Sequence, residues 1–107
     1  MAETKSMLAH AVYFTLKDNS PESVERQIAA CQKYLTGHDG TVFFGVGPRT
    51  PDLKRDVNDK EFDVGLHVIF RDRAAHDAYQ EHERHVQFIE ENKPLWAKVR
   101  VCDADLE

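Results

Sequence analysis

Two stretches of the chain alternate between apolar and polar or small positions with a period of two, which is typical of strands. In residues 8–16 one face carries Leu8, His10, Val12, Phe14 and Leu16. In residues 62–70 one face carries Phe62, Val64, Leu66, Val68 and Phe70. Residues 41–47 are rich in β-branched and aromatic side chains, and residues 98–102 form a shorter run. The pattern therefore predicts four strands.

Helical spacing fills two of the intervals between these strands. Ser20 and Pro21 predict a helix start, because the serine hydroxyl accepts from a free backbone N–H and proline has none to lose. The first helix is expected over 21–36, with Gly37 as its stop and an apolar stripe of Val24, Ile28, Cys31 and Leu35. Asp72 can cap a second helix. Its expected buried stripe is Ala75, Ala78, Tyr79 and His82, with Val86, Ile89 and Trp96 on further turns.

The resulting order, β-α-β-β-α-β, is the split βαβ pattern of a ferredoxin-like sandwich. We expect an α+β fold with a four-stranded antiparallel sheet and both helices on one face. Residues 1–107 are interpreted as one domain with its core over 7–103. Residues 48–61 carry two prolines and eight charged side chains, and they are expected to form an exposed loop. The acidic tail, 104–107, is expected to fray.

The second face of the sheet has no helix left to cover it. Alternation places there Ala9, Ala11, Tyr13, Gly65, Ile69 and one of the aromatics Phe43 and Phe44. An exposed apolar face of this kind usually marks an association surface. The simplest closed solution is a homodimer in which each sheet covers the other. A monomer with a partly wet second face is the alternative.

Composition narrows the classes of partner. The chain has 107 residues and a formal net charge of −5, which argues against nucleic-acid binding. The longest apolar run is short, Ala11 to Phe14, so neither a membrane span nor a secretory signal is expected. Cys31 and Cys102 have no metal-binding or redox spacing, and two thiols suit a reducing, cytoplasmic location.

Four segments resemble the stress-responsive dimeric α/β-barrel (Dabb) family. They are the opening strand His10-Ala-Val-Tyr-Phe-Thr-Leu-Lys17, the helix motif Ala75-x-x-Ala78-Tyr79, the turn His82-Glu-Arg-His85-Val86, and the final strand Val99-Arg-Val-Cys-Asp103. The resemblance covers residues 8 to 103. It implies a ferredoxin-like protomer and a sheet-to-sheet dimer, the dimeric α/β barrel.

The resemblance also implies a chemistry. Plant members of the olivetolic acid cyclase type close a linear polyketide by aldol condensation without a cofactor. Their general base matches His85, their carbonyl-binding tyrosine matches Tyr79, and a further pocket histidine matches His10. This chain has Val64 where the plant cyclases have another histidine. It also has Glu83 and Arg84 where the family turn has proline and a small residue.

The altered turn has a geometric consequence. Residues six apart on an unbroken helix are separated by about 120° around its axis. Tyr79 and His85 therefore converge only if the helix still breaks between them. Without convergence, His85 is a hydrogen-bonded histidine that fixes the turn, and Tyr79 is part of the core. His82 is expected to satisfy backbone groups in either case.

Two histidine pairs are candidate metal sites. His10 faces the helices, where it is either a satisfied core histidine or a pocket wall, whereas His67 falls on the opposite face. The pair His82-x-x-His85 has no third ligand placed beside it. We therefore expect no metal and no cofactor.

The sequence favours a small-molecule-binding module with an apolar pocket for a small hydrophobic or aromatic ligand. The expected ligand-binding residues are His10, Val12, Phe14, Val64, Leu66, His82, Phe88 and Trp96, beside Tyr79 and His85. The alternative is a cofactor-independent cyclase or isomerase with His85 as base and Tyr79 as carbonyl-binding group. A cofactor-free monooxygenase has less support.

Overall fold

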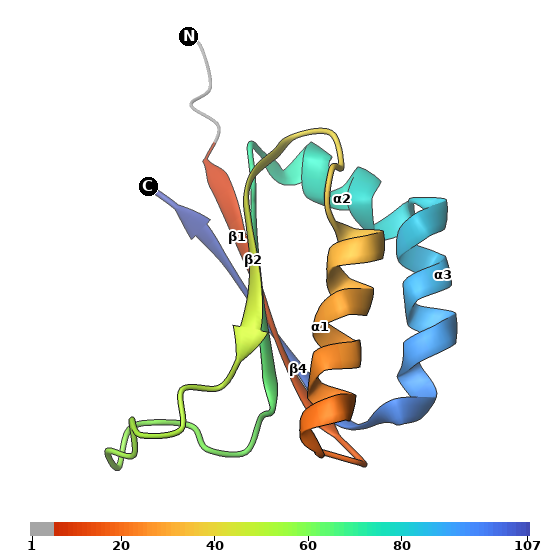
Figure 1. Cartoon of the computed structure of the whole chain (residues 1–107). Coiled ribbons are helices and arrows are strands. Elements are labelled where there is room, and N and C mark those ends of the chain that lie inside the picture. Colours follow the sequence, from red (N-terminus) through yellow and green to blue (C-terminus); the bar gives the residue numbers. More distant parts are fainter. Residues whose placement is uncertain (1–5) are drawn as a thin grey trace, which may run out of the picture.

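A computed structural model describes residues 6–107. Its elements are β1 (Met7–Leu16), α1 (Pro21–Leu35), β2 (Thr41–Pro48), β3 (Val64–Phe70), α2 (Arg73–Glu81), α3 (Glu83–Asn92), the short 3-10 helix η1 (Lys93–Leu95) and β4 (Trp96–Leu106). The strands form one antiparallel sheet in the order β2-β3-β1-β4. All three α-helices lie on one side of it (Figure 1). The α+β ferredoxin-like prediction is confirmed.

β1 is one of the two central strands, and its pairing sets the register of the site. It pairs with β3 on one side, with Val12 opposite Leu66, and with β4 on the other, with His10 opposite Asp103. The predicted alternation holds, because His10 and its apolar neighbours on the helix side are buried. The core combines this face of the sheet with Ile28, Cys31, Leu35 and other helix residues.

The first helix begins as the sequence predicts. The Ser20 hydroxyl accepts from the Ser23 N–H at 3.3 Å, and Pro21 occupies the first helical position. The helix ends at Leu35, one residue earlier than predicted, and Gly37 follows with a φ of +75°.

Two strand boundaries differ slightly from prediction. β2 extends through Pro48, so the exposed loop begins at residue 49 rather than 48. β3 starts at Val64, because Phe62 leaves the strand and packs its ring against Tyr13 on the other face, 4.9 Å between centroids. Asp63 ties the end of the loop to β1, since its carboxylate accepts from the Leu16 N–H at 2.8 Å.

The second helix is two helices that meet at His82. His82 has a ψ of 140°, which is extended, and it caps α2 and α3 at once. The expected stripe is therefore only half right. Ala75 and Tyr79 are buried, but Ala78 and His82 are exposed, because the change of direction turns this corner toward solvent.

The last strand is longer than its sequence pattern predicts. β4 spans Trp96–Leu106, so the predictions of a strand over 98–102 and of a frayed tail over 104–107 are wrong. Ala104 pairs with Ala9 and Leu106 with Met7. Backbone pairing to β1 holds this acidic segment despite its charge. Residues 1–5 of the expected 1–107 domain lie outside the described part.

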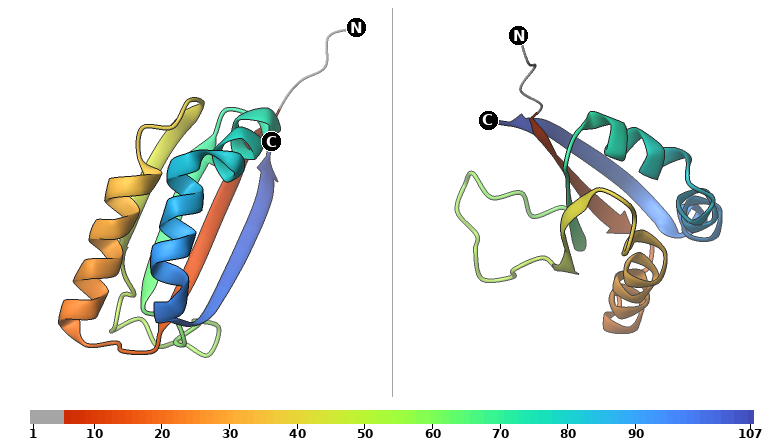
Figure 2. Two further views of the ribbon diagram at one scale, coloured as in Figure 1. Left: turned by 90° about the vertical axis from the view of Figure 1, so that its right-hand side faces the viewer. Right: turned by 90° about the horizontal axis from the view of Figure 1, so that it is seen from above.

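The second face of the sheet carries no helix in the described chain, as Figure 2 shows from two directions. Phe43, 52% exposed, lies on this open face, whereas Phe44 packs against the core. The loop of residues 49–63 reaches β4, where Asp59 contacts Arg100. None of the helices between residues 6 and 107 is long and apolar enough to cross a bilayer.

Candidate functional site

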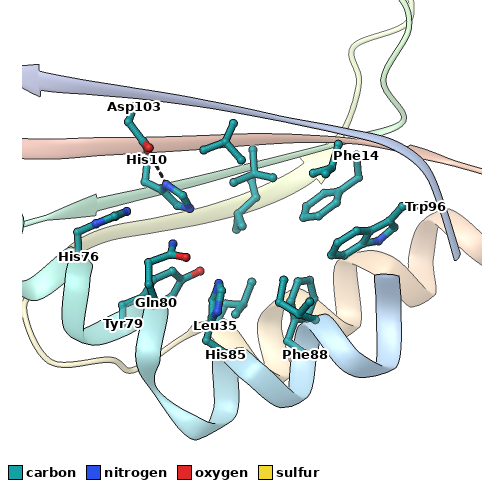
Figure 3. Close-up of a pocket in the computed structure, with 15 residues that line it drawn as sticks. His10, Phe14, Leu35, His76, Tyr79, Gln80, His85, Phe88, Trp96 and Asp103 are labelled. Atoms are coloured by element: carbon teal, nitrogen blue, oxygen red, sulfur yellow. Dashed lines mark hydrogen bonds and ion pairs between the residues drawn. The ribbon is translucent and has the colours of Figure 1, made fainter. Parts of the chain in front are cut away.

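A cavity of about 290 Å³ lies between the β1–β4 side of the sheet and helices α2 and α3 (Figure 3). Its lining is mainly apolar, with a polar end formed by residues from β1, β4 and α2. The lining residues are His10, Val12, Phe14, Leu35, Leu66, His76, Tyr79, Gln80, His85, Phe88, Ile89, Trp96, Val99, Val101 and Asp103. The exposure of Val99, Val101 and Asp103 opens the cavity along β4.

The structure brings most of the predicted site residues to this cavity. They are His10, Val12, Phe14, Leu66, Tyr79, His85, Phe88 and Trp96. Val64 does not line it, because its side chain is fully enclosed in the core. His82 does not line it either, because the exposed corner carries it to a second hollow beside His38 and Arg84.

Sequence reasoning missed three polar residues of the lining. His76 and Gln80 lie four apart on α2, so one helical face carries both. Counting four residues from the Asp72 cap would have found His76. Asp103 lies directly opposite His10, but the expected last strand stopped one residue short of it.

The break at His82 brings Tyr79 and His85 together without the proline of the family turn. The Nδ1 of His82 accepts from the Arg84 N–H at 3.1 Å, which caps the first turn of α3. The chain bends there, and the Tyr79 and His85 rings meet edge to face with 4.7 Å between centroids.

Arg84, one of the two residues that depart from the family turn, fixes the bend from outside. Its guanidinium donates to the backbone carbonyls of Thr36 at 2.9 Å and Lys33 at 2.7 Å. These are orphan carbonyls at the end of α1, where a cation is favourable. The start of α3 is thereby tied to the end of α1.

Burial keeps His85 neutral. Burial is the main cause of a pKa of about 4 for His85, and the neighbouring His10 and His38 imidazoles contribute to this lowering in the same direction. At neutral pH the side chain therefore presents an uncharged imidazole, which can donate one hydrogen bond and accept another.

Tyr79 holds a buried hydroxyl that finds no hydrogen-bond partner within residues 6–107. Its side chain is 2% exposed, and burial raises the pKa of Tyr79, so the phenol stays protonated. An unpaired buried hydroxyl costs roughly 1–3 kcal/mol. A ligand oxygen in the cavity would supply the missing hydrogen-bond acceptor.

The His10 side chain is hydrogen-bonded and also lines the cavity. Its Nδ1 lies 2.6 Å from an Asp103 carboxylate oxygen. Because a carboxylate only accepts, Nδ1 donates and Nε2 is left as an acceptor. Burial lowers the pKa of His10, and this outweighs the opposing effect of Asp103.

The candidate metal ligands differ from the pairs considered in the sequence. His67 lies on the open face, opposite Ala11, so it cannot meet His10. Among the described residues, His10, His76 and Asp103 instead form a group with one potential ligand atom each, all within 4.8 Å of one another.

The chain is similar in sequence and structure to one group of proteins. A family model described as Stress responsive A/B Barrel Domain, or Dabb, matches residues 8–106. A Dabb family protein with a ferredoxin-like fold from Mesorhizobium loti is 28% identical with a TM-score of 0.78, covering 96% of this chain and 99% of that one. A search of curated proteins gives no match.

Two further solved structures share the fold. A dimeric ferredoxin-like protein of unknown function from Thermobifida fusca has a TM-score of 0.78 at 18% identity, covering 99% of this chain and 96% of that one. A hydroxynitrile lyase from Passiflora edulis has a TM-score of 0.76 at 18% identity, covering 97% and 96%.

Proposed function

Because the chain belongs to the stress-responsive A/B barrel domain (Dabb) family, we propose that it binds a small, largely apolar molecule in the cavity between its sheet and helices α2 and α3. The proposed ligand is hydrophobic or aromatic and carries one oxygen acceptor. A cavity of about 290 Å³ is near the lower end of the usual size for small-molecule sites, about 300–1,000 Å³.

The unpaired hydroxyl of Tyr79 is the observation that carries this proposal. Apolar walls such as Phe88 and Trp96 supply contact area, but they do not orient a ligand. Tyr79 can donate to a carbonyl or hydroxyl oxygen. Neutral His85 beside it is hydrogen-bonded to the Gln80 backbone through one ring nitrogen, and its other ring nitrogen can accept. Together they define a polar anchoring point among the apolar walls of the cavity.

Turnover is the second proposal, with His85 as general base and Tyr79 binding the carbonyl. A base works best when its pKa lies near the working pH. Since the pKa of His85 is about 4, it is a weak proton acceptor at neutral pH. Binding without turnover is therefore the function that the site supports better.

Native mass spectrometry of freshly purified protein tests the binding proposal. We expect a non-covalent small molecule to accompany the wild-type chain and to be depleted in Tyr79→Phe. Val86→Ala, at an exposed position of α3, is the matched control and should retain it. The absence of any bound molecule, together with no saturable binding of aromatic ketones or phenols by calorimetry, would overturn the proposal.

We further propose that two protomers pair through the open sheet face, with a cytoplasmic location. Similar structures of the same fold are described as dimeric. Ala9, Ala11 and half-exposed Phe43 give this face the small and apolar surface that a sheet-to-sheet contact requires.

A further inference from the structure

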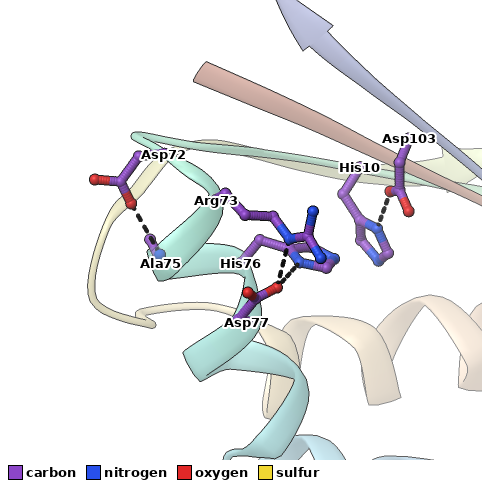
Figure 4. A network of polar contacts seen from close by, with 7 residues as sticks. All are labelled: His10, Asp72, Arg73, Ala75, His76, Asp77 and Asp103. Carbon is purple, nitrogen blue, oxygen red and sulfur yellow. Dashed lines mark hydrogen bonds and ion pairs between the residues drawn. The ribbon is translucent and has the colours of Figure 1, made fainter. Parts of the chain in front are cut away.

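The polar end of the cavity contains three side chains with the spacing of an ion site. His10 comes from β1, Asp103 from β4 and His76 from α2. Figure 4 shows the rings of His10 and His76 near one another, with Asp103 beside His10. The ring centroids lie 5.2 Å apart, and the three potential ligand atoms lie within 4.8 Å of one another. We propose that His10, His76 and Asp103 bind a divalent first-row transition ion of the Zn²⁺ or Fe²⁺ type.

The orientation of His76 is fixed from its far side. Its Nδ1 lies 2.9 Å from an Asp77 carboxylate oxygen, and the same oxygen accepts from Arg73 Nε at 2.8 Å. Because the carboxylate can only accept, Nδ1 carries the proton and Nε2 keeps its lone pair for the site. A carboxylate that orients a histidine in this way is the usual outer partner of a metal-binding imidazole.

The backbone holds the three residues in place. His10 and Asp103 are direct partners across β1 and β4, so both side chains project from the same face of the sheet. His76 lies in the first turn of α2, whose start is fixed by the Asp72 carboxylate accepting from the Ala75 N–H at 2.9 Å. Two strands and a capped helix therefore converge on one point.

Only small movements separate this arrangement from a coordination sphere. Ligand atoms around a tetrahedral zinc ion lie roughly 3.3 Å apart, given metal–ligand distances of about 2.0–2.1 Å. The Nδ1 of His10 and the Asp103 carboxylate oxygen, now 2.6 Å apart, would separate slightly as the ion displaces the proton from Nδ1, and His76 would move closer. Asp103 has room to rotate because its side chain is 43% exposed. That exposure also provides an entry route.

The donor set selects the ion class. Two imidazoles and one carboxylate suit borderline divalent ions, whereas Mg²⁺ and Ca²⁺ prefer oxygen ligands alone. Three protein ligands leave a coordination position open toward the cavity. The buried Tyr79 hydroxyl lines the same cavity. An organic ligand or water on the ion would lie within this shared space, although ion binding does not depend on the small-molecule proposal.

Titration of the untagged, chelator-treated full chain with Co²⁺ tests the proposal. We expect saturable binding of one ion per chain, visible d–d absorption, displacement by Zn²⁺ and no competition by Mg²⁺. His76→Ala should abolish the absorption. Asp77→Ala, which removes the outer partner of His76 and leaves the three ligands in place, should weaken binding by about 10–100-fold.

The matched control is His67→Ala, which removes an imidazole from the opposite face of the sheet. It should bind Co²⁺ like the wild type, and circular dichroism should show that all variants remain folded. Absence of Co²⁺ binding by the wild type, or unchanged binding by His76→Ala, would overturn the proposal. If the wild-type protein binds Co²⁺ but carries and binds no small molecule, only the binding function proposed above is contradicted.

Discussion

At the scale of single residues, the binding proposal depends on one polar group of the cavity lining that makes no hydrogen bond within residues 6–107. The Tyr79 hydroxyl is buried without a partner among the described residues, whereas the Asn92 side chain, also buried, donates to the Phe88 carbonyl at 2.9 Å. This contrast separates a structural polar group from one that is left available. Two predictions follow from the side chains of the anchoring point.

Tyr79→Phe should stabilise the ligand-free protein. The substitution keeps the ring that packs on Phe70 and His85. It removes a hydroxyl that loses its hydration on folding and gains no hydrogen bond in return. We expect the free energy of unfolding to rise by about 1 kcal/mol, measured by urea denaturation of ligand-free protein. A decrease of that size would mean that the hydroxyl makes a stabilising contact, and the anchoring role would then fail.

His85 should make the protein less stable as the pH falls. An unfolded histidine binds a proton near pH 6.5, whereas folded His85 does so only near pH 4. Between these values the unfolded chain holds more protons, so the free energy of unfolding falls as the pH falls through this window. His10 and His38, whose pKa values are also lowered by burial, act in the same direction.

Urea denaturation at a series of pH values measures this slope. His85→Gln should flatten the decline between about pH 6.5 and 4, while above pH 7 the stability of both proteins should be independent of pH for this group. A variant with the wild-type slope would show that His85 is not the group responsible.

The residue-level sequence predictions succeeded where periodicity alone decides. Alternation correctly separated His10, on the helix side, from His67 on the open face. Apolar periodicity alone did not select His76, because a histidine beside an aspartate is typical of an exposed helix position, although its spacing from the Asp72 cap could have located it. Although the family resemblance places Asp103 at the end of the final strand, alternation did not select it as a site residue, because a carboxylate interrupts the apolar series of Val99 and Val101.

At the scale of elements, the bend at His82 determines where the site residues meet. A sequence with neither proline nor glycine at this corner gives no strong break signal. The break depends on a histidine cap and on Arg84 reaching the end of α1, and both are tertiary or side-chain geometry. Similarly, the length of β4 depends on pairing with β1, which its own residues do not reveal.

Glu83→Pro should be tolerated at this corner. Position 83 is the first residue of α3, where a missing N–H costs nothing, and His82 already has the extended geometry that precedes proline. We expect stability to be unchanged or raised by about 0.4–1 kcal/mol in thermal unfolding. Val86→Pro is the control, because the Val86 N–H donates to the His82 carbonyl at 3.0 Å and its loss should cost about 3 kcal/mol. Equal destabilisation by both substitutions would contradict the assigned break.

At the scale of the whole molecule, the sheet has one covered face and one bare face. This is the level that the sequence predicted most completely, because element order and alternation follow from local pattern alone. The helices cover the side of Val12 and Leu66, and the opposite side presents Phe43 and Ala11. The dimer proposed above would cover the bare face.

Phe43→Asp should shift the protein from dimer to monomer. A charge at this exposed apolar position would be buried without a partner in a sheet-to-sheet contact. In sedimentation equilibrium we expect the wild type at twice the 12.3 kDa chain mass and the variant at the chain mass. Val86→Asp, on the outer side of α3, should remain dimeric. A wild-type monomer at micromolar concentration would contradict the interface.

The pairing of Met7 with Leu106 puts the first residue of β1 beside the last residue of β4. A short glycine-rich bridge should therefore join them, while new ends are opened within the exposed segment 51–57. Such a circular permutant would place the β1–β4 hairpin in the middle of the polypeptide and keep every strand neighbour unchanged.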